Sequence, residues 1–304
     1  MRNSGKKIIA GIVTAAIAAS ASMSLWMQTS VNAETAASSA AGEFKESGKI
    51  WIVGDSIASD HDIDEANEVQ ITGWGNVLQQ IAPEGVTIIN KARSGRSSKS
   101  YTTEPVYKEV IKGVGPGDYV IIQFGHNDEK EGAKLYTDPE GDSNTEGSYK
   151  YYLKTKFIEP ICEKGGRVIL ASSVVRHLFD GDKLGEQTHS VYAQAMKELA
   201  EECSKEGMEV YFIDTNKITS DIYTKLGDEE TKKLHAVTGK GDSAQIDDTH
   251  YSPYGAVYMA NIMGQQLKDL GISCMKDTQE AWLIEDDSDT IKSTRNSLDK
   301  FSWR

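Results

Sequence analysis

Five short apolar segments alternate with amphipathic segments along most of this chain, and this alternation limits its possible folds more than any other feature. The apolar segments are residues 49–53, 86–92, 118–124, 167–174 and 208–214. They are apolar at nearly every position, which is typical of strands that are buried on both faces. The segments between them have helical periodicity. The sequence therefore predicts right-handed βαβ crossovers and a flavodoxin-like three-layer α/β/α sandwich with a five-stranded, mostly parallel sheet.

The N-terminus has the pattern of a secretory signal peptide. Lys6 and Lys7 precede a long apolar stretch, and the small residues of "VNA" at 31–33 form a cleavage site. We therefore expect residues 1–33 to be a signal peptide and the mature protein to be secreted and extracellular, with no membrane contact after cleavage. The apolar stretch is long enough that an uncleaved anchor is the alternative.

The remaining sequence divides into three parts. Residues 34–48 are small and polar without a periodic apolar face, so they are expected to be a linker. Residues 49–275 contain all the strand and helix patterns, and this length suits one catalytic domain with one large core. Residues 276–304 are charged and form a C-terminal appendage.

Net charge and histidine spacing exclude several classes of function. The formal net charge is -13, which disfavours nucleic acid as a partner because phosphate-backbone binders need a basic face. His126, His177 and His189 form no HxH or HExxH motif. No metal site and no cofactor are therefore expected.

Polar, glycine-containing turns follow three of the predicted strands. They are "GDS" at 54–56, "NKARSG" at 90–95 and "GHND" at 125–128. In an open parallel sheet, ligands bind at the carboxyl ends of the strands, near the point where the strand order reverses. These turns therefore converge on one edge of the sheet. A fourth polar segment, "DDTHYSPYGA" at 247–256, is expected to be a loop before the final helix.

These segments contain the side chains that acyl transfer needs. A serine hydroxyl becomes nucleophilic when a histidine takes its proton, and that histidine needs a carboxylate to fix its tautomer. Ser56, His250 and Asp247 are these three parts, since Asp247 stands one tight turn before His250. The backbone N–H groups of Ser56 and Gly95 and the side-chain amide of Asn127 could form an oxyanion hole.

Taken singly, each of these segments also has an ordinary structural explanation. "GDS" is a common strand-to-helix turn in which Asp55 or Ser56 caps a helix. Ser252 and Pro253 suit the first positions of a helix. The combination of all segments in this order at strand ends favours a functional site.

The combination resembles the SGNH, or GDSL-like, hydrolase family, and more closely its rhamnogalacturonan acetylesterase branch. The resemblance rests on "GDS", "GRSSKSY", "QFGHND", "SSVVRHLF", "THSVYAQAM" and "DDTHYSPYGA", over about residues 49–270. It implies the SGNH hydrolase fold, Ser56 as nucleophile, His250 as base and Asp247 as its orienting acid. It also implies Gly95 and Asn127 as oxyanion donors. The choice of Asp247 over Asp248 rests on the family's spacing.

The resemblance and the basic segment 91–99 together suggest the substrate. Arg96 and Lys99 are expected to bind galacturonate carboxylates, and the alternative is a solvated loop that balances nearby acids. We therefore expect a secreted serine esterase that removes acetyl groups from plant cell-wall polysaccharide, namely rhamnogalacturonan or pectin. The alternatives are an esterase for acetylxylan or another acetylated oligosaccharide, a lipase or thioesterase of the same superfamily, and a non-catalytic carbohydrate-binding domain.

Overall fold

The computed structural model describes residues 48–61, 71–239 and 243–278. The predicted signal peptide, almost all of the predicted linker and residues 279–304 of the appendage lie outside these ranges. Within them, no helix has the length and hydrophobicity needed to span a bilayer.

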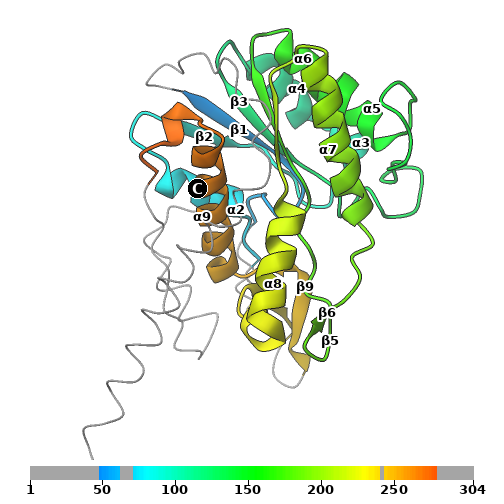
Figure 1. The fold of residues 1–304 in the computed structure, drawn as a ribbon, viewed down its shortest axis with the longest axis vertical. Helices are drawn as coiled ribbons and strands as arrows, with labels where there is room; N and C mark the ends of the chain where they lie inside the picture. Colours follow the sequence, from blue (N-terminus) through cyan, green and yellow to red (C-terminus); the bar gives the residue numbers. More distant parts are fainter. Residues whose placement is uncertain (1–47, 62–70, 240–242, 279–304) are drawn as a thin grey trace, which may run out of the picture. The chain divides into compact units, whose positions relative to one another are not determined.

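A central sheet of five parallel strands confirms the predicted fold class (Figure 1). The strand order is β2-β1-β3-β4-β7, so the direction of strand addition reverses between β1 and β3. The carboxyl ends of these two strands are therefore the expected place for a ligand. The strands are β1 (Lys49–Gly54), β2 (Thr87–Asn90), β3 (Tyr119–Gln123), β4 (Arg167–Ala171) and β7 (Val210–Ile213).

Two buried clusters, one on each face of the sheet, make the three layers. Along β1, Ile50 and Ile52 belong to one cluster, and Trp51 and Val53 to the other. The side chains of a strand alternate between faces, so a strand covered on both sides must be apolar throughout. The first face is covered by α2 (Trp74–Ile81), α8 (Thr215–Lys232) and α9 (Pro253–Asp269), and the second by α4 (Pro105–Gly113), the π-helix η2 (Tyr152–Ile158), α6 (Glu159–Cys162) and α7 (Ser190–Lys205).

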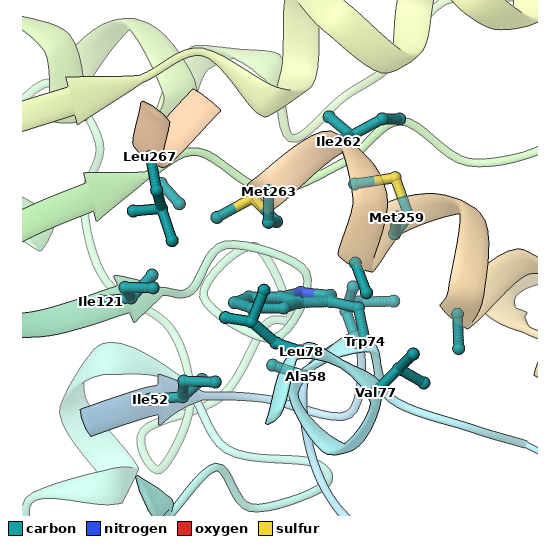
Figure 2. Packing of buried hydrophobic residues seen from close by; sticks show 14 of the residues in the cluster. Ile52, Ala58, Trp74, Val77, Leu78, Ile121, Met259, Ile262, Met263 and Leu267 are labelled. Atoms are coloured by element: carbon teal, nitrogen blue, oxygen red, sulfur yellow. The ribbon is translucent and has the colours of Figure 1, made fainter. Parts of the chain in front are cut away.

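Helix α2 shows how periodicity in the sequence becomes packing. Trp74, Val77, Leu78 and Ile81 have the spacing of one helical face, and all four are buried. Figure 2 shows the Trp74 indole between α9 and the strand residues of β1 and β3. Its Nε1–H donates a hydrogen bond of 2.7 Å to Gln123 Oε1. The largest buried side chain on this face thus also satisfies a polar group at the end of β3.

Shorter elements complete the described part of the chain. A short α3 (Ser98–Tyr101) follows the loop after β2, and α5 (Tyr149–Tyr151) leads into η2. Two small antiparallel pairs lie outside the central sheet, and a 3₁₀ turn, η4 (Ser273–Met275), follows α9. The pairs are β5 (Phe179–Asp180) with β6 (Lys183–Leu184), and β8 (His235–Thr238) with β9 (Gln245–Tyr251).

The second of these pairs corrects one expectation. Residues 247–251 were predicted to lie in a loop before the final helix, but they form the end of β9. Tyr251 pairs with His235 of β8, and residues 247–250 lie in an irregular stretch between this pair and the pair of Ile246 with Val237. The expected helix start is confirmed, because the Ser252 side chain accepts a hydrogen bond from Gly255 N and Pro253 is the first residue of α9. The hairpin fixes both ends of the stretch that contains Asp247 and His250, because the residues on either side of it are paired with β8.

Candidate active site

Ser56 lies in a tight turn at the carboxyl end of β1, next to the point where the strand order reverses. Asp55 shapes this turn, because its Oδ1 accepts a hydrogen bond of 3.0 Å from Ile57 N and its backbone oxygen accepts one of 3.1 Å from Ser59 N. The sequence left open whether Asp55 and Ser56 have a structural or a functional role, and the structure gives one of these roles to each. Asp55 caps the turn, and the Ser56 hydroxyl faces a histidine instead.

The Ser56 hydroxyl, His250 and Asp247 form one line of hydrogen bonds. Ser56 Oγ is 2.9 Å from His250 Nε2, and His250 Nδ1 is 2.9 Å from Asp247 Oδ2. A carboxylate accepts only, so Nδ1 carries the proton and Nε2 is free to accept one from Ser56. Asp248 does not take this place, because its Oδ1 accepts from the Thr249 hydroxyl.

The other oxygen of Asp247 fixes the carboxylate to the backbone. Asp247 Oδ1 accepts hydrogen bonds from Thr249 N at 2.9 Å and from His250 N at 2.8 Å. Burial raises the pKa of Asp247, but the hydrogen bonds from the His250 side chain and backbone outweigh it and lower that pKa to about 2. The carboxylate is therefore ionised at neutral pH and is oriented before any substrate arrives.

A buried histidine supports Asp247 from the β8 strand. His235 Nδ1 donates to the backbone oxygen of Asp247 at 3.0 Å, and Tyr223 Oη donates to His235 Nε2 at 2.8 Å. Burial lowers the pKa of His235 to about 3, so the ring is neutral and its tautomer is set by these two partners. Helix α8 thus positions the acid indirectly through the hairpin.

Two of the candidate oxyanion donors, Gly95 and Asn127, lie on loops that contact each other. Arg93 N donates to Gly54 O at 2.9 Å, which holds the loop after β2 against the end of β1. Asn127 Nδ2 donates to Arg96 O at 3.1 Å. Gly95 lies between these contacts with a φ of +76°, a conformation that strains any side-chain-bearing residue.

The loop that carries Asn127 is anchored by the residue that follows it. Asp128 is buried, and its carboxylate accepts from Ser98 N at 3.1 Å, from Ser98 Oγ at 2.5 Å and from Thr137 Oγ1 at 2.9 Å. The loop begins at Gly125, where a Cβ would lie 2.5 Å from Ser173 Oγ. These contacts place Asn127 in a rigid part of the loop.

The basic segment is more neutral than its sequence indicates. Arg96 forms an ion pair with Glu104, with Nη2 at 2.7 Å and Nε at 2.8 Å from Oε1, and Lys91 pairs with Glu109. Lys99 lies 5.9 Å from the centre of the Tyr152 ring. These contacts agree with the alternative of a loop that balances its charge with nearby acids. A substrate-binding role of Arg96 and Lys99 stays a prediction.

A buried pair of titratable groups lies beneath the nucleophile turn. His126 Nε2 donates to Val174 O at 2.7 Å, and burial and the neighbouring His189 lower its pKa, so Nδ1 is an unprotonated acceptor. That Nδ1 faces Asp55 Oδ2 at 3.9 Å, and neither atom has a hydrogen-bond partner among the described residues. Burial raises the pKa of Asp55 from 3.8 to about 6.

Asp55→Asn should change the pH dependence of stability. A raised carboxyl pKa means that the folded state binds the proton more tightly than the unfolded state, so this contribution to stability is lost as pH rises from about 4 through about 6. Asparagine does not titrate, so the variant does not lose stability in this way as pH rises. It keeps the side-chain oxygen that accepts from Ile57 N. We expect its free energy of unfolding, relative to wild type, to increase by roughly 2 kcal/mol between pH 4.5 and 8.

Urea unfolding of both proteins at pH 4.5, 6 and 8 measures this difference. The buried histidines titrate in both proteins, so their contributions largely cancel in the comparison. A difference that stays constant across the three pH values would contradict a raised pKa of Asp55.

Arg176 joins four segments around the site. Its Nε donates to Thr249 Oγ1 at 3.2 Å, its Nη1 donates to His189 Nδ1 at 3.2 Å, and its Nη2 binds Glu129. Its backbone N donates to Gln187 Oε1 at 2.8 Å. The loop after β3, the loop before α7 and the β9 strand are thereby held together at one guanidinium.

Sequence reasoning missed three residues of this region. Arg176 lies in the segment "SSVVRHLF" at 172–179, but its role was missed because most of its partners are distant in the sequence. His61 Nε2 lies 2.8 Å from Ser56 O and 3.0 Å from Ser59 Oγ, and its ring centre is 6.4 Å from that of His250. Lys130 Nζ donates to Asn127 Oδ1 at 2.8 Å, a contact that the three-residue spacing of a turn could have suggested. No group of three or more metal-ligating side chains comes together in the described ranges.

Comparisons with known proteins show the family of the chain. The family described as GDSL-like Lipase/Acylhydrolase matches residues 50–263. The chain is 32% identical over 230 residues to the rhamnogalacturonan acetylesterase RhgT of Bacillus subtilis (strain 168), covering 74% of this chain and 91% of that protein. It is 31% identical over 226 residues to the probable rhamnogalacturonan acetylesterase YesY of the same strain, covering 73% of this chain and 94% of YesY.

A solved structure is also similar. The crystal structure of the Bacillus subtilis protein YxiM matches with a TM-score of 0.58 and 26% sequence identity over 75% of this chain. The chain spans 58% of the length of that structure.

Proposed function

Because the chain belongs to the GDSL-like lipase/acylhydrolase family and is an esterase, we propose that it removes acetyl groups from an acetylated pectic polysaccharide, namely rhamnogalacturonan. The observation that carries the chemistry is the line from Ser56 Oγ through the His250 ring to Asp247 Oδ2, with both distances at 2.9 Å. The observation that supports the substrate is the sequence identity of 32% to a rhamnogalacturonan acetylesterase and of 31% to a probable one, over 91% and 94% of their lengths.

In the proposed reaction, Ser56 Oγ attacks the acetyl carbonyl carbon while His250 Nε2 takes the hydroxyl proton. Asp247 holds the proton on Nδ1 and stabilises the imidazolium that forms. The imidazolium then gives its proton to the sugar oxygen, which leaves. Water, deprotonated by the same Nε2, hydrolyses the acetyl-Ser56 ester and releases acetate.

The negative oxygen of each tetrahedral intermediate needs donors that are already in place. We assign the backbone N–H groups of Ser56 and Gly95 and the Asn127 amide to this role. The support is that Arg93 N binds Gly54 O and Asn127 Nδ2 binds Arg96 O, so the two donor loops are held beside the nucleophile turn. Fixed donors of this kind are typically worth about 3–4 kcal/mol each.

The site of action is a separate proposal. We propose that the enzyme works outside the cell, which is where polymeric pectin occurs, and the support is the signal-peptide pattern of residues 1–33.

One observation favours a second candidate, an esterase for acetylxylan or another neutral acetylated polysaccharide. Arg96 and Lys91 are neutralised by Glu104 and Glu109, so the segment expected to attract galacturonate holds less free charge than predicted. A lipase has less support, because among the described residues the large exposed apolar side chains are Tyr136 and Val191. A lipase would need a broader apolar surface for an acyl chain.

Acetate release from acetylated rhamnogalacturonan, acetylated homogalacturonan and acetylxylan tests the substrate. We expect the highest kcat/KM on rhamnogalacturonan, and we expect none on any polymer with Ser56→Ala, which serves as the control for spontaneous hydrolysis. A higher kcat/KM on acetylxylan would select the second candidate. Hydrolysis of long-chain esters without acetate release from any of the three polymers would contradict a carbohydrate acetylesterase.

A further inference from the structure

Lys130 and Asn127 belong to one turn. The backbone N of Lys130 donates to Asn127 O at 3.2 Å, which brings the two side chains to the same side of the turn. Lys130 Nζ then donates to Asn127 Oδ1 at 2.8 Å. Because the backbone of the turn already holds the two residues close together, forming this contact restricts the Lys130 side chain only a little further.

The two ends of the Asn127 amide face opposite kinds of partner. Oδ1 faces an ammonium group, which can only donate, and Nδ2 faces the backbone oxygen of Arg96, which can only accept. A flipped amide would place donor against donor and acceptor against acceptor. Nδ2 has two N–H bonds, and one of them is used by Arg96 O. The second has no acceptor among the described residues and can bind a negative oxygen of the substrate.

No carboxylate of the described residues forms an ion pair with Lys130, whereas Lys91 and Arg96 each bind a glutamate. A cation that donates a hydrogen bond to Oδ1 draws electron density from the amide nitrogen. The remaining N–H of the amide then becomes a stronger donor. Asn127 is 3% exposed, whereas Lys130 is exposed, so the amide end of the contact is shielded from solvent. The positive charge of Lys130 also acts on the Asp55 carboxyl next to Ser56. Burial raises the pKa of Asp55, and the charge of Lys130 offsets a part of this rise.

We propose that Lys130 is a positioning residue that orients and polarises the Asn127 amide for the oxyanion of the tetrahedral intermediate. The inference rests on the proposed function, because it takes Asn127 as an oxyanion donor. Since the transition state contains the oxyanion and the bound ester does not, the effect belongs in kcat and not in KM.

The kinetics of Lys130→Met on p-nitrophenyl acetate test this inference. We expect kcat to fall roughly tenfold, a part of the 10²- to 10³-fold loss that follows removal of a whole oxyanion donor, with KM and the melting temperature unchanged. Lys130→Arg should restore most of the kcat, because it keeps a charged donor. Lys134→Met removes the same charge from an exposed position of the same loop and should leave kcat unchanged.

A second measurement separates action through Asn127 from other roles. In an Asn127→Ala background, Lys130→Met should lower kcat no further, because the amide through which it acts is gone. An equal fall in both backgrounds would contradict the inference. So would a loss confined to acidic polysaccharide, because a lysine that binds a substrate carboxylate would not affect p-nitrophenyl acetate.

The same set of variants distinguishes a failure of the proposed oxyanion role of Asn127 from a failure of the inference about Lys130. If Asn127→Ala itself keeps full kcat, the oxyanion role of Asn127 and this inference are both wrong. If Asn127→Ala loses activity but Lys130→Met does not, only the inference about Lys130 is wrong.

Discussion

Ser56→Ala should lose nearly all ester hydrolysis and keep its fold. The Ser56 hydroxyl is the atom that would form the acyl bond, and without it only bound water can attack. Removing the nucleophile of a serine hydrolase typically costs roughly 10⁴- to 10⁶-fold in kcat. Ser56 is buried, but its hydroxyl caps no helix, because Asp55 makes the contacts that shape the turn. The melting temperature should therefore change little.

The measurement is kcat/KM on p-nitrophenyl acetate together with thermal unfolding. Ser94→Ala is the matched control, since Ser94 is an exposed serine on the neighbouring loop. It should keep wild-type activity. A Ser56→Ala protein that retains activity within tenfold of wild type would remove Ser56 from the mechanism.

Asp247→Asn should be nearly as damaging. The asparagine keeps an oxygen for Thr249 N and His250 N, so the hairpin should fold normally. Its other end is now an amide donor that faces His250 Nδ1, which favours the tautomer with the proton on Nε2. That tautomer cannot accept the Ser56 proton. Such a substitution typically lowers kcat by roughly 10⁴-fold.

Asp248→Asn is the control for Asp247→Asn, because it removes the same charge one residue away. Asp248 is exposed, and its Oδ1 accepts from the Thr249 hydroxyl. We expect it to keep most of its activity. If Asp248→Asn were the inactive protein and Asp247→Asn the active one, the assignment of the orienting acid would be wrong by one residue.

The sheet could be predicted from the sequence because each of its strands is covered on both faces. Such strands have apolar residues at almost every position, as "KIWIV" and "YVIIQ" illustrate. This pattern can be recognised within one strand, without knowing which strands lie beside it. Helix α2 was predicted for a similar reason, since Trp74, Val77, Leu78 and Ile81 lie at helical spacing. The strand order then placed the polar turns at one edge.

Helix α8 was not predicted, although Ile218, Ile222 and Leu226 lie at helical spacing and pack against the core. The polar residues Thr215, Asn216, Thr219 and Thr231 are also buried along it, and Gly227 breaks it with a φ of 74°. These polar residues and the glycine interrupt its apolar pattern. A cap signal was present, since the Asp214 side chain accepts from Lys217 N. The polar strand β9 was missed for a different reason, because its pairing with β8 joins residues that no local sequence pattern connects.

The line of Ser56, His250 and Asp247 could be predicted because chemistry restricts which residue types can perform each step. Surface charge could not be predicted in the same way. Arg96 looked free in the segment 91–99, but Glu104 lies eight residues further on, in the turn before α4, and binds it. Whether a charged side chain forms an ion pair depends on which other segments the fold brings next to it. The same limitation hid Arg176, whose partners come from three other segments.

The most direct test of the mechanism is the position of a covalent label. An organophosphorus fluoride phosphorylates serines that are activated by a histidine, and peptide mass mapping locates the adduct. We expect one adduct on the peptide that contains Ser56, at the same rate as the loss of esterase activity. The His250→Ala protein should be labelled far more slowly, because nothing takes the hydroxyl proton. Full inactivation with the adduct on any residue other than Ser56 would contradict the proposed nucleophile.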